Sequence, residues 1–327
     1  MVNLFDLEGG QIGDENRSSS PPLGGAISSE AIHRMMNRSL SLEVIRKRRT
    51  FSEKEPREFY NFLSKFKILD EIQWNTRTLA MAIEQVCWGI AKERIAHVEL
   101  KLSVDKYSQQ MHCGPKEVSK FIYKQCLEES QKHGFQMALV LCLKYEANRE
   151  RQKEISKLVE DPDIARCFVG IDLVGDEAHY DADFYADILR PWKQIGKGLV
   201  AHVGETQSAE NVRTAIEKIG VRRVAHGIQA FHDPSIRSLA KERDICFDVA
   251  LSSNLYTGIV QDLKNHPVKF LLEHDVPFTI GTDDPTVLDT TLDKEYVLLS
   301  NTFGLDDLQL ISIMRNSAKY AFGGKLI

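Results

Sequence analysis

The stretch GLVAHVGETQSAENVRTAIEKIGVRRVAH, residues 198–226, decides the fold class. An apolar run at 198–202 leads into a segment that Ser208 can cap as a helix, and Gly220 can end that helix. A second apolar run follows at 221–226. Two continuous apolar strands joined by a helix with one apolar face are typical of a parallel sheet that helices cover.

The same alternation extends over most of the chain. Further apolar runs lie at 95–100, 137–143, 167–173, 245–250 and 277–283. Seven strands are therefore predicted between about Ile95 and Asp284, after a long amphipathic helix over 76–92. This predicts an α/β fold, a (β/α)₈ barrel of the TIM type. An open doubly wound sheet is the alternative, but it usually carries a Gly-rich phosphate loop, which we do not find.

The eighth strand has to come from the start of the chain, where the sequence is a poor match. Val2–Leu7 is the best candidate, and Gly9–Gly25 is rich in Gly, Ser and Pro, which is typical of a loop. We expect an atypical or incomplete first strand. The predicted organisation is an atypical segment at 1–22 and a single barrel domain at 23–327, with a helical insertion at about 40–92.

Composition narrows the classes of partner. With 43% hydrophobic and 27% charged residues, a net charge of −5 and a pI near 6.1, neither a nucleic-acid surface nor an anionic membrane partner is expected. Six cysteines without a CxxC pair predict thiols in a reducing compartment. The first 25 residues contain no continuous apolar segment, so we expect no secretory signal and a cytoplasmic location.

Polar residues stand where the predicted strands end, and those ends form the mouth of a parallel barrel. Imidazole and carboxylate groups that converge there form a ligand set suited to Zn²⁺. Taken alone, each of these polar residues has a simpler interpretation. A histidine can be a packed side chain, an Asp-Asp-Pro or Gly-Asp-Glu sequence can be a turn or loop, and Glu205 can be a carboxylate at a helix N-terminus. Asp172 could lie beside a ligand or be structural, and the structural role is favoured. The candidates are His202, Glu205, His226, Asp283, Asp284 and Gly175.

Four segments together resemble the adenosine deaminase family of metal-dependent hydrolases. They are GIDLVGDE at 170–177, VAHVGET at 200–206, RRVAHGI at 222–228 and IGTDDP at 280–285. GGAISSEAI at 24–32 and SSNLYTG at 252–258 also look like that family. The resemblance covers roughly residues 24 to 322 and implies hydrolysis of adenosine or a related purine to the 6-oxo product and ammonia, a reaction of purine nucleotide metabolism.

The resemblance also implies a role for each candidate residue. His202 and Asp283 would bind the metal, expected to be Zn²⁺. Glu205 would protonate the ring nitrogen next to the attacked carbon, and His226 would stand over the water as a base or an electrostatic partner. The substrate-binding groups would be the Gly175 N–H, on a purine nitrogen, and Asp284, on the five-membered ring.

The chain departs from the family at its first strand. The family has a His-x-His pair of metal ligands there, directly before a Leu-Asp-Gly or Leu-Glu-Gly turn. In this chain Ser20, Pro21 and Pro22 precede Leu23-Gly24-Gly25, and no His-x-His occurs anywhere in the sequence. Leu7-Glu8-Gly9 gives a second possible register, in which Asp6 could restore one ligand. Gly24 also stands where the family often has an acidic residue that touches ribose.

Three hypotheses follow. The chain could be a working aminohydrolase with an unusual first strand, or a catalytically impaired, purine-binding pseudoenzyme that lacks two metal ligands. Alternatively, residues 1–22 are not the natural start of an otherwise ordinary deaminase. The sequence leaves the oligomeric state and the identity of the purine open.

Overall fold

A computed structural model describes residues 18–19, 21–52 and 54–322. The strands are β1 (Ser18–Ser19), β2 (His97–Leu102), β3 (Gln136–Lys144), β4 (Gly170–Val174), β5 (Gly198–Val203), β6 (Arg223–His226), β7 (Cys246–Val249) and β8 (Phe278–Ile280). The helices before β4 are α1 (Leu23–Ala26), α2 (Ser29–Met35), α3 (Leu42–Arg49), α4 (Phe59–Ser64), η2 (Lys67–Glu71), α5 (Thr76–Lys92), α6 (Val104–Met111), α7 (Pro115–His133), α8 (Arg149–Ser156), η3 (Lys157–Glu160) and α9 (Pro162–Ala165).

The helical segments after β4 are mostly shorter. They are η4 (Glu177–His179), α10 (Ala182–Ile188), α11 (Arg190–Gln194), α12 (Ala209–Thr214), η5 (Ala215–Ile219), η6 (Ile228–Ala230), α13 (Pro234–Glu242), α14 (Leu251–Tyr256), η7 (Leu263–Asn265), α15 (Val268–Glu273), α16 (Pro285–Leu288), α17 (Leu292–Phe303) and α18 (Asp307–Tyr320).

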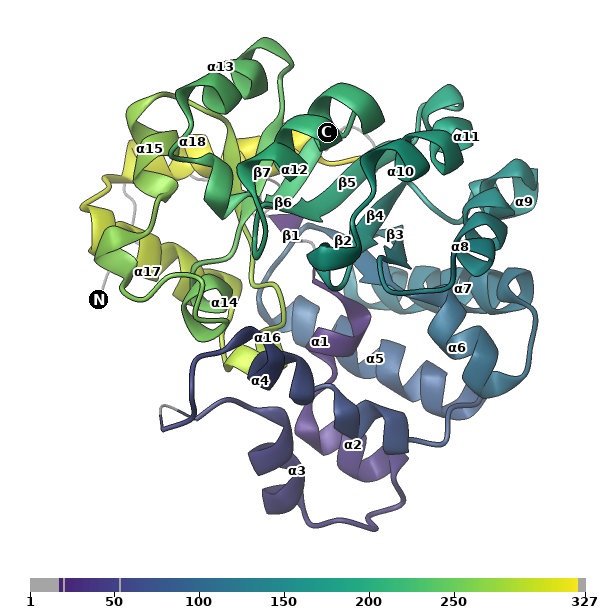
Figure 1. The fold of residues 1–327 in the computed structure, drawn as a ribbon. Coiled ribbons are helices and arrows are strands. Elements are labelled where there is room, and N and C mark those ends of the chain that lie inside the picture. The colour runs from purple at the N-terminus through teal and green to yellow at the C-terminus, as the bar shows by residue number, and fades with distance from the viewer. Residues whose placement is uncertain (1–17, 20, 53, 323–327) are drawn as a thin grey trace.

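The strands form one parallel sheet in the order β1 to β8, and every ladder joins neighbours in the sequence. The strands lie at the centre of the molecule and the helices surround them (Figure 1). The predicted α/β barrel is confirmed, and each of the seven predicted apolar runs overlaps one of the strands β2 to β8, with boundaries that differ by up to three residues. The carboxyl ends of all eight strands therefore meet at one end of the barrel.

Local sequence explains the best-predicted helices. Asn75 caps α5 by accepting hydrogen bonds from the backbone of Arg77 and Thr78, at 3.0 and 3.1 Å. The apolar side chains of α5, including Leu79 and Ile83, are buried against the core. Gly220 ends the helical segment after β5 with a φ of 77°, a conformation that glycine adopts without steric cost.

The first strand differs from the sequence-based expectation. Val2–Leu7 lies outside the described residues, and the strand that pairs with β2 is Ser18–Ser19. Pro22 continues the register as a bridge to Lys101, whose N–H donates to the carbonyl of Pro21 at 3.0 Å. The placement of the first strand at Val2–Leu7 was therefore wrong. A two-residue strand fits the expected incompleteness, since proline has no N–H to extend the ladder.

Within the described residues, no hydrogen-bonded register joins β8 to β1. Contacts between α16, which follows β8, and the segment after β1 connect the two ends of the sheet instead. Thr286 donates to the carbonyl of Gly25 and lies 3.1 Å from the carbonyl oxygen of Ile27. Arg49 of α3 donates to the carbonyl of Gly24 and lies fully buried between the two segments.

Charged residues interrupt the apolar strands and pair inside the fold. Arg223 of β6 lies 2.6 Å from Glu99 of β2 and 3.2 Å from Asp248 of β7. Lys101 of β2 lies 2.8 Å from Asp172 of β4. Because buried charges are tolerated when they are paired, these contacts explain how charged side chains fit into central strands.

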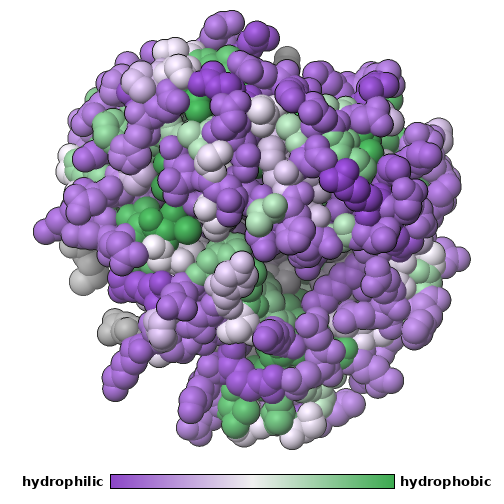
Figure 2. Space-filling model, in the orientation of Figure 1, coloured by the Kyte–Doolittle hydropathy of each residue, from purple (hydrophilic) through white to green (hydrophobic). Residues whose placement is uncertain are grey.

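The cysteines, the surface and the helices have the character that the composition predicts. All six cysteines are free thiols, five of them buried. The face shown in Figure 2 is largely hydrophilic, with hydrophobic side chains in separate small groups. Among the described helices, none combines the length and the apolar character needed to cross a membrane.

Candidate active site

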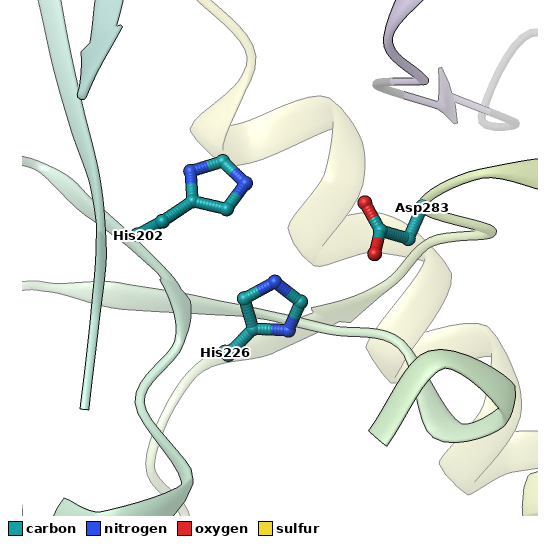
Figure 3. Close-up of side chains that lie close together, drawn as sticks. All are labelled: His202, His226 and Asp283. Atoms are coloured by element: carbon teal, nitrogen blue, oxygen red, sulfur yellow. The ribbon is translucent and has the colours of Figure 1, made fainter. Parts of the chain in front are cut away.

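Three side chains converge at the carboxyl ends of the strands. His202 lies near the end of β5, His226 ends β6, and Asp283 follows β8. Their candidate ligand atoms all lie within 4.8 Å of one another, and the three side chains point toward a common centre (Figure 3). The structure thus brings together the imidazoles and the carboxylate that the sequence placed on three different strands.

Two of these residues have unusual backbone conformations. His226 has a φ of 63° and Asp283 a φ of 51°, both in the left-handed region. This conformation is uncommon for residues other than glycine and costs free energy, so the surrounding structure has to maintain it. Such residues are concentrated at functional sites, and both occur here at strand ends that face the centre.

His202 is oriented by a buried ion pair. Its Nδ1 lies 2.9 Å from Asp172 Oδ1, while Lys101 Nζ lies 2.8 Å from the other carboxylate oxygen. Burial opposes ionisation of Asp172, but His202 and Lys101 outweigh it and hold the pKa of this carboxyl below its ordinary value. Asp172 therefore fits the role of a group beside a ligand, the alternative to the structural role that the sequence favoured.

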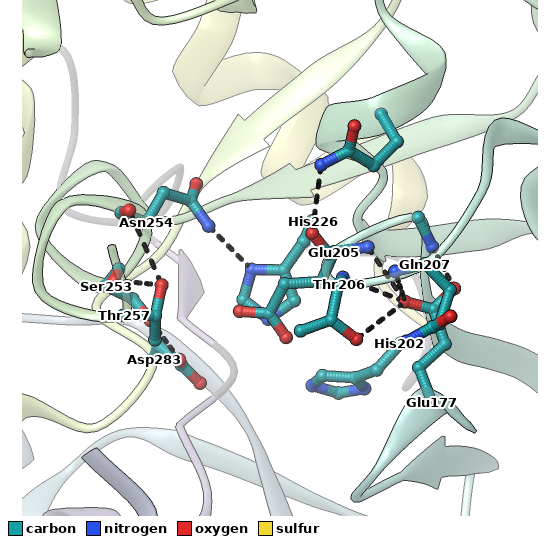
Figure 4. A network of polar contacts seen from close by, with 12 residues as sticks. Glu177, His202, Glu205, Thr206, Gln207, His226, Ser253, Asn254, Thr257 and Asp283 are labelled. Atoms are coloured by element: carbon teal, nitrogen blue, oxygen red, sulfur yellow. Dashed lines mark hydrogen bonds and ion pairs between the residues drawn. The ribbon is translucent and has the colours of Figure 1, made fainter. Parts of the chain in front are cut away.

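Helix α14 supplies partners for the other two central residues. Ser253 Oγ donates to Asp283 Oδ2 at 2.7 Å, and Asn254 Nδ2 lies 3.2 Å from His226 Nδ1. Both α14 side chains are fully buried. The segment SSNLYTG, quoted above as a family-like motif, therefore holds two of the three central side chains in place (Figure 4).

Glu205 lies beside His226. Its Oε2 is 3.8 Å from His226 Nε2, and its side chain is nearly buried. Burial raises the pKa of Glu205 to about 7, with the nearby carboxylates of Asp283 and Glu177 adding to the effect and His226 opposing it. A carboxyl with this pKa is substantially protonated at neutral pH, which is what a general acid requires.

The loop that carries Glu205 is anchored by a second glutamate. The buried carboxylate of Glu177 accepts hydrogen bonds from the backbone N–H groups of Glu205, Thr206 and Gln207, at 3.1, 3.0 and 3.0 Å. It also accepts from the backbone N–H of Gly204. Four consecutive N–H groups on one carboxylate fix the direction of the loop, and with it the position of Glu205.

The two predicted substrate-binding residues lie at the same end of the barrel. Asp284 is buried, and its Oδ1 has no hydrogen-bond partner within the described part of the chain. Burial and the neighbouring Asp283 raise the pKa of Asp284 well above its ordinary value, although Arg49 opposes this. Gly175 follows β4 with a φ of 100°, and a Cβ there would lie 2.1 Å from Glu146 Oε2.

A pocket connects the central residues with the barrel interior. His202, His226 and Asp283 form part of its wall, together with Lys101, Arg223 and Asp248. Sequence reasoning did not select Lys101, Ser253, Asn254 or Glu177 as site residues. One signal was available for Lys101, because a lysine in a strand predicted to be buried requires a buried partner.

Comparison with known sequences identifies the family. The profile of the family described as adenosine deaminase matches residues 40–325. An adenosine deaminase from Shewanella denitrificans is 32% identical over 154 residues, which cover 47% of this chain and 46% of the relative. An aminodeoxyfutalosine deaminase from Acidothermus cellulolyticus is 38% identical over 140 residues, 41% of this chain and 39% of the relative. The chain thus aligns with about half the length of these curated relatives.

Comparison with solved structures supports the fold. Adenine deaminase from Arthrobacter aurescens matches with a TM-score of 0.82 at 16% identity, over 94% of both chains. The N6-mAMP deaminase of Arabidopsis matches with a TM-score of 0.81 at 17% identity, over 95% of both chains. An amidohydrolase from Burkholderia ambifaria with bound zinc matches with a TM-score of 0.84 at 18% identity, over 97% of this chain and 91% of that one. Because the family profile spans most of its length, the chain belongs to the adenosine deaminase family.

Proposed function

We propose that this chain hydrolyses the exocyclic amino group of adenosine or a related purine. Water adds its oxygen to the ring carbon, and the carbon–nitrogen bond breaks. In the overall balance, ammonia leaves with the two amino protons and one proton of the water, and the second water proton stays on the ring nitrogen of the 6-oxo product. The observation that carries this proposal is the convergence of His202, His226 and Asp283 within 4.8 Å, at the strand ends of a barrel from this family.

Each residue has a part in this reaction. Glu205, with its pKa raised to about 7, would protonate the ring nitrogen next to the attacked carbon and make that carbon electrophilic. His226 faces Glu205 across the site and would contact the attacking water. Burial and the neighbouring Asp283 raise the pKa of Asp284 well above its ordinary value, so this carboxyl would donate its proton to a nitrogen of the five-membered ring. Its Oδ1 has no hydrogen-bond partner among the described residues. The N–H of Gly175 would donate to a second ring nitrogen.

The central residues fit a zinc ion in kind and in spacing. Imidazole and carboxylate groups are ordinary zinc ligands, so His202 and Asp283 would hold the metal. The contact of His202 with Asp172 is also typical of a metal-binding histidine. Bound zinc lowers the pKa of water to about 7 and so makes a nucleophile available at neutral pH. Catalytic zinc sites usually have three protein ligands, so two predict weak binding.

The substrate is proposed only as a class. A structurally similar protein is named for adenine and another for N6-mAMP, which suggests a purine as the shared feature. At Gly24, where the family often has an acidic residue, this chain presents a backbone carbonyl that binds Arg49. Because no acidic side chain at position 24 selects for ribose, adenosine, deoxyadenosine and free adenine are all candidate substrates. Each of them would assign the chain to cytoplasmic purine metabolism.

Ammonia release from adenosine, measured beside the zinc content of the same preparation, tests the proposal. The purified protein should contain well under one zinc per chain and release ammonia slowly, and added zinc should raise the rate. The Glu205→Gln variant serves as the control for contaminating deaminase. Equal rates for both proteins, or no release from adenosine, deoxyadenosine or adenine at saturating zinc, would reject catalysis.

A second candidate function is purine binding without catalysis. Pro22 pairs with Lys101 on the strand where the family resemblance calls for a metal-binding histidine, and this observation favours it. In that case adenosine should bind, as measured by calorimetry, while no ammonia appears at any zinc concentration. Binding that is abolished by a substitution at Asp284 would assign the ligand to the barrel mouth.

A further inference from the structure

The two central histidines differ in the partner of their Nδ1 atom. His202 Nδ1 faces a carboxylate oxygen of Asp172 at 2.9 Å. In contrast, His226 Nδ1 faces the amide nitrogen of Asn254 at 3.2 Å (Figure 4). A neutral imidazole carries one proton on one of its two nitrogens. The partner of Nδ1 therefore decides whether Nε2 offers a lone pair or an N–H group to the centre.

His202 is held as the tautomer that can bind a metal. Lys101 Nζ can only donate, and it lies against one oxygen of Asp172, which leaves the other oxygen to accept from His202. The proton of His202 consequently sits on Nδ1, and its Nε2 carries a lone pair. This is the carboxylate–histidine arrangement found beside zinc ions.

The tautomer of His226 follows from a chain of hydrogen bonds that begins at a backbone amide. The N–H of Val268 can only donate, and it donates to His266 Nδ1 at 3.0 Å. Burial lowers the pKa of His266 to about 3, so the ring is neutral and its proton sits on Nε2. That N–H faces Asn254 Oδ1 at 3.2 Å and donates to it.

The orientation of the Asn254 amide is thereby fixed. Because its oxygen accepts from His266, its NH₂ group faces His226 and donates to Nδ1. A proton on Nδ1 of His226 would point at the amide hydrogens of Asn254, and two donors cannot form a hydrogen bond with each other. Its own proton must then lie on Nε2, the atom that faces Glu205 Oε2 at 3.8 Å.

We propose that His266 and Asn254 hold His226 as its Nε2–H tautomer, so that His226 donates a hydrogen bond toward the centre and is withheld from the metal. Asp172 and Asn254 thus give two neighbouring histidines opposite functions, a ligand and a donor. In deamination, an Nε2–H group would bind the oxygen of the attacking water and not remove its proton. That role rests on the proposed function, whereas the tautomer does not.

Nitrogen NMR of the metal-free protein tests the tautomers directly. Protonated and unprotonated imidazole nitrogens have well-separated chemical shifts, and the His226 signals can be assigned by their loss in a His226→Gln variant. We expect the proton on Nδ1 in His202 and on Nε2 in His226. A proton on Nδ1 of His226 in the wild-type protein would overturn the proposal.

The Asn254→Asp variant should reverse the tautomer of His226. A carboxylate at this position accepts from both His266 and His226, so His226 should move its proton to Nδ1 and present a lone pair to the centre. Its zinc affinity should then rise by about 10–100-fold, the usual effect of a carboxylate partner on a metal-binding histidine. Asn301→Asp, at an exposed position of α17, adds the same charge and should leave zinc affinity unchanged.

The outcomes separate this proposal from the proposed function. A folded Asn254→Asp variant, with an unchanged melting temperature but also an unchanged His226 tautomer and zinc affinity, would contradict the inference. If that variant does not fold, the wild-type spectrum decides. A chain that releases no ammonia but shows the two opposite tautomers would fail the proposed function and leave this inference standing.

Discussion

The carboxylate of Asp284 lies directly against the backbone of Gly25. A Cβ atom added to Gly25 would fall 1.7 Å from Asp284 Oδ1 and 2.9 Å from its Cα, so only glycine fits beside this carboxylate. The same oxygen lacks a hydrogen-bond partner among the described residues. The turn after the first strand therefore shapes the position of a predicted substrate-binding group from the opposite end of the sequence.

Gly25→Ala should therefore weaken purine binding. The methyl group would displace Asp284, and adenosine affinity measured by calorimetry should fall by about tenfold, the loss of roughly one good hydrogen bond. Gly24→Ala is the matched control, because a Cβ there meets only Leu69 Cδ1 at 3.4 Å. Equal adenosine affinity in the two variants would show that Asp284 does not contact the ligand.

Glu205→Gln should separate binding from turnover. The amide retains the shape of the side chain but cannot deliver a proton, so ammonia release should fall by at least about a hundredfold. Adenosine affinity should stay within about tenfold, since proton transfer matters mainly in the transition state. Normal turnover in this variant would rule out Glu205 as the proton donor.

The pKa of Glu205 also predicts a pH dependence of stability. Folding raises this pKa from the ordinary 4.5 to about 7, so between these values the native state holds a proton that the unfolded state has released. The free energy of unfolding should therefore fall as pH rises through this window. Below the window both states are protonated, and above it neither is, so the contribution of this group is then constant.

Urea unfolding of the wild type and Glu205→Gln, in the presence of a chelator, measures this effect. The variant has no proton to lose, so its stability relative to the wild type should increase from roughly pH 4.5 to pH 7 and then level off. A stability difference that does not change with pH would show that folding does not shift the pKa of Glu205.

The strands after residue 94 and the three central residues could be predicted from the sequence, because both follow from local patterns of apolar and polar residues. Seven apolar runs separated by helices are visible without any tertiary information, and polar residues at strand ends have to meet in a parallel barrel. His202, His226 and Asp283 were found in this way. Their roles remain predictions, since position does not establish which atom binds a metal.

The remaining contacts depend on tertiary packing. Asn254 lies on a short helix. The orientation of its side-chain amide depends on His266, twelve residues further on, and on the N–H of Val268. Nothing local marks such a chain of hydrogen bonds. The first strand was misplaced because Val2–Leu7 has the stronger strand propensity, whereas pairing with β2 decides the position of β1.

Asp172→Asn should weaken zinc binding through His202. Lys101 can only donate and would take the amide oxygen, so the amide NH₂ would face His202 Nδ1 and move the imidazole proton to Nε2. Zinc affinity, measured by competition with a chelating dye, should fall by about 10–100-fold. Asp183→Asn removes an exposed carboxylate from α10 and is the control. An unchanged zinc affinity would assign Asp172 a structural role alone.

The sequence has no His-x-His pair before Leu23, where the family resemblance calls for two metal ligands. Pro22 is paired in parallel register with Lys101, and paired residues of neighbouring strands project to the same face of a sheet. Lys101 faces Asp172 and the central pocket, so a histidine at position 22 should face them too. Ser20 lies outside the described residues, but in an extended chain position 20 projects to the same side as position 22.

The double variant Ser20→His with Pro22→His should therefore gain zinc and activity together. Two added imidazoles would raise the protein ligands from two to four, enough for a stable site, and zinc content should approach one per chain. Ser19→His with Pro21→His is the matched control, because it places the same two side chains on the opposite face. Zinc content by elemental analysis and ammonia release from adenosine are measured in all three proteins. Full zinc and fast turnover in the unmodified chain would show that another residue completes the site, with Asp6 the first candidate. No gain in the double variant would show that the strand itself, and not its two side chains, is what this chain lacks.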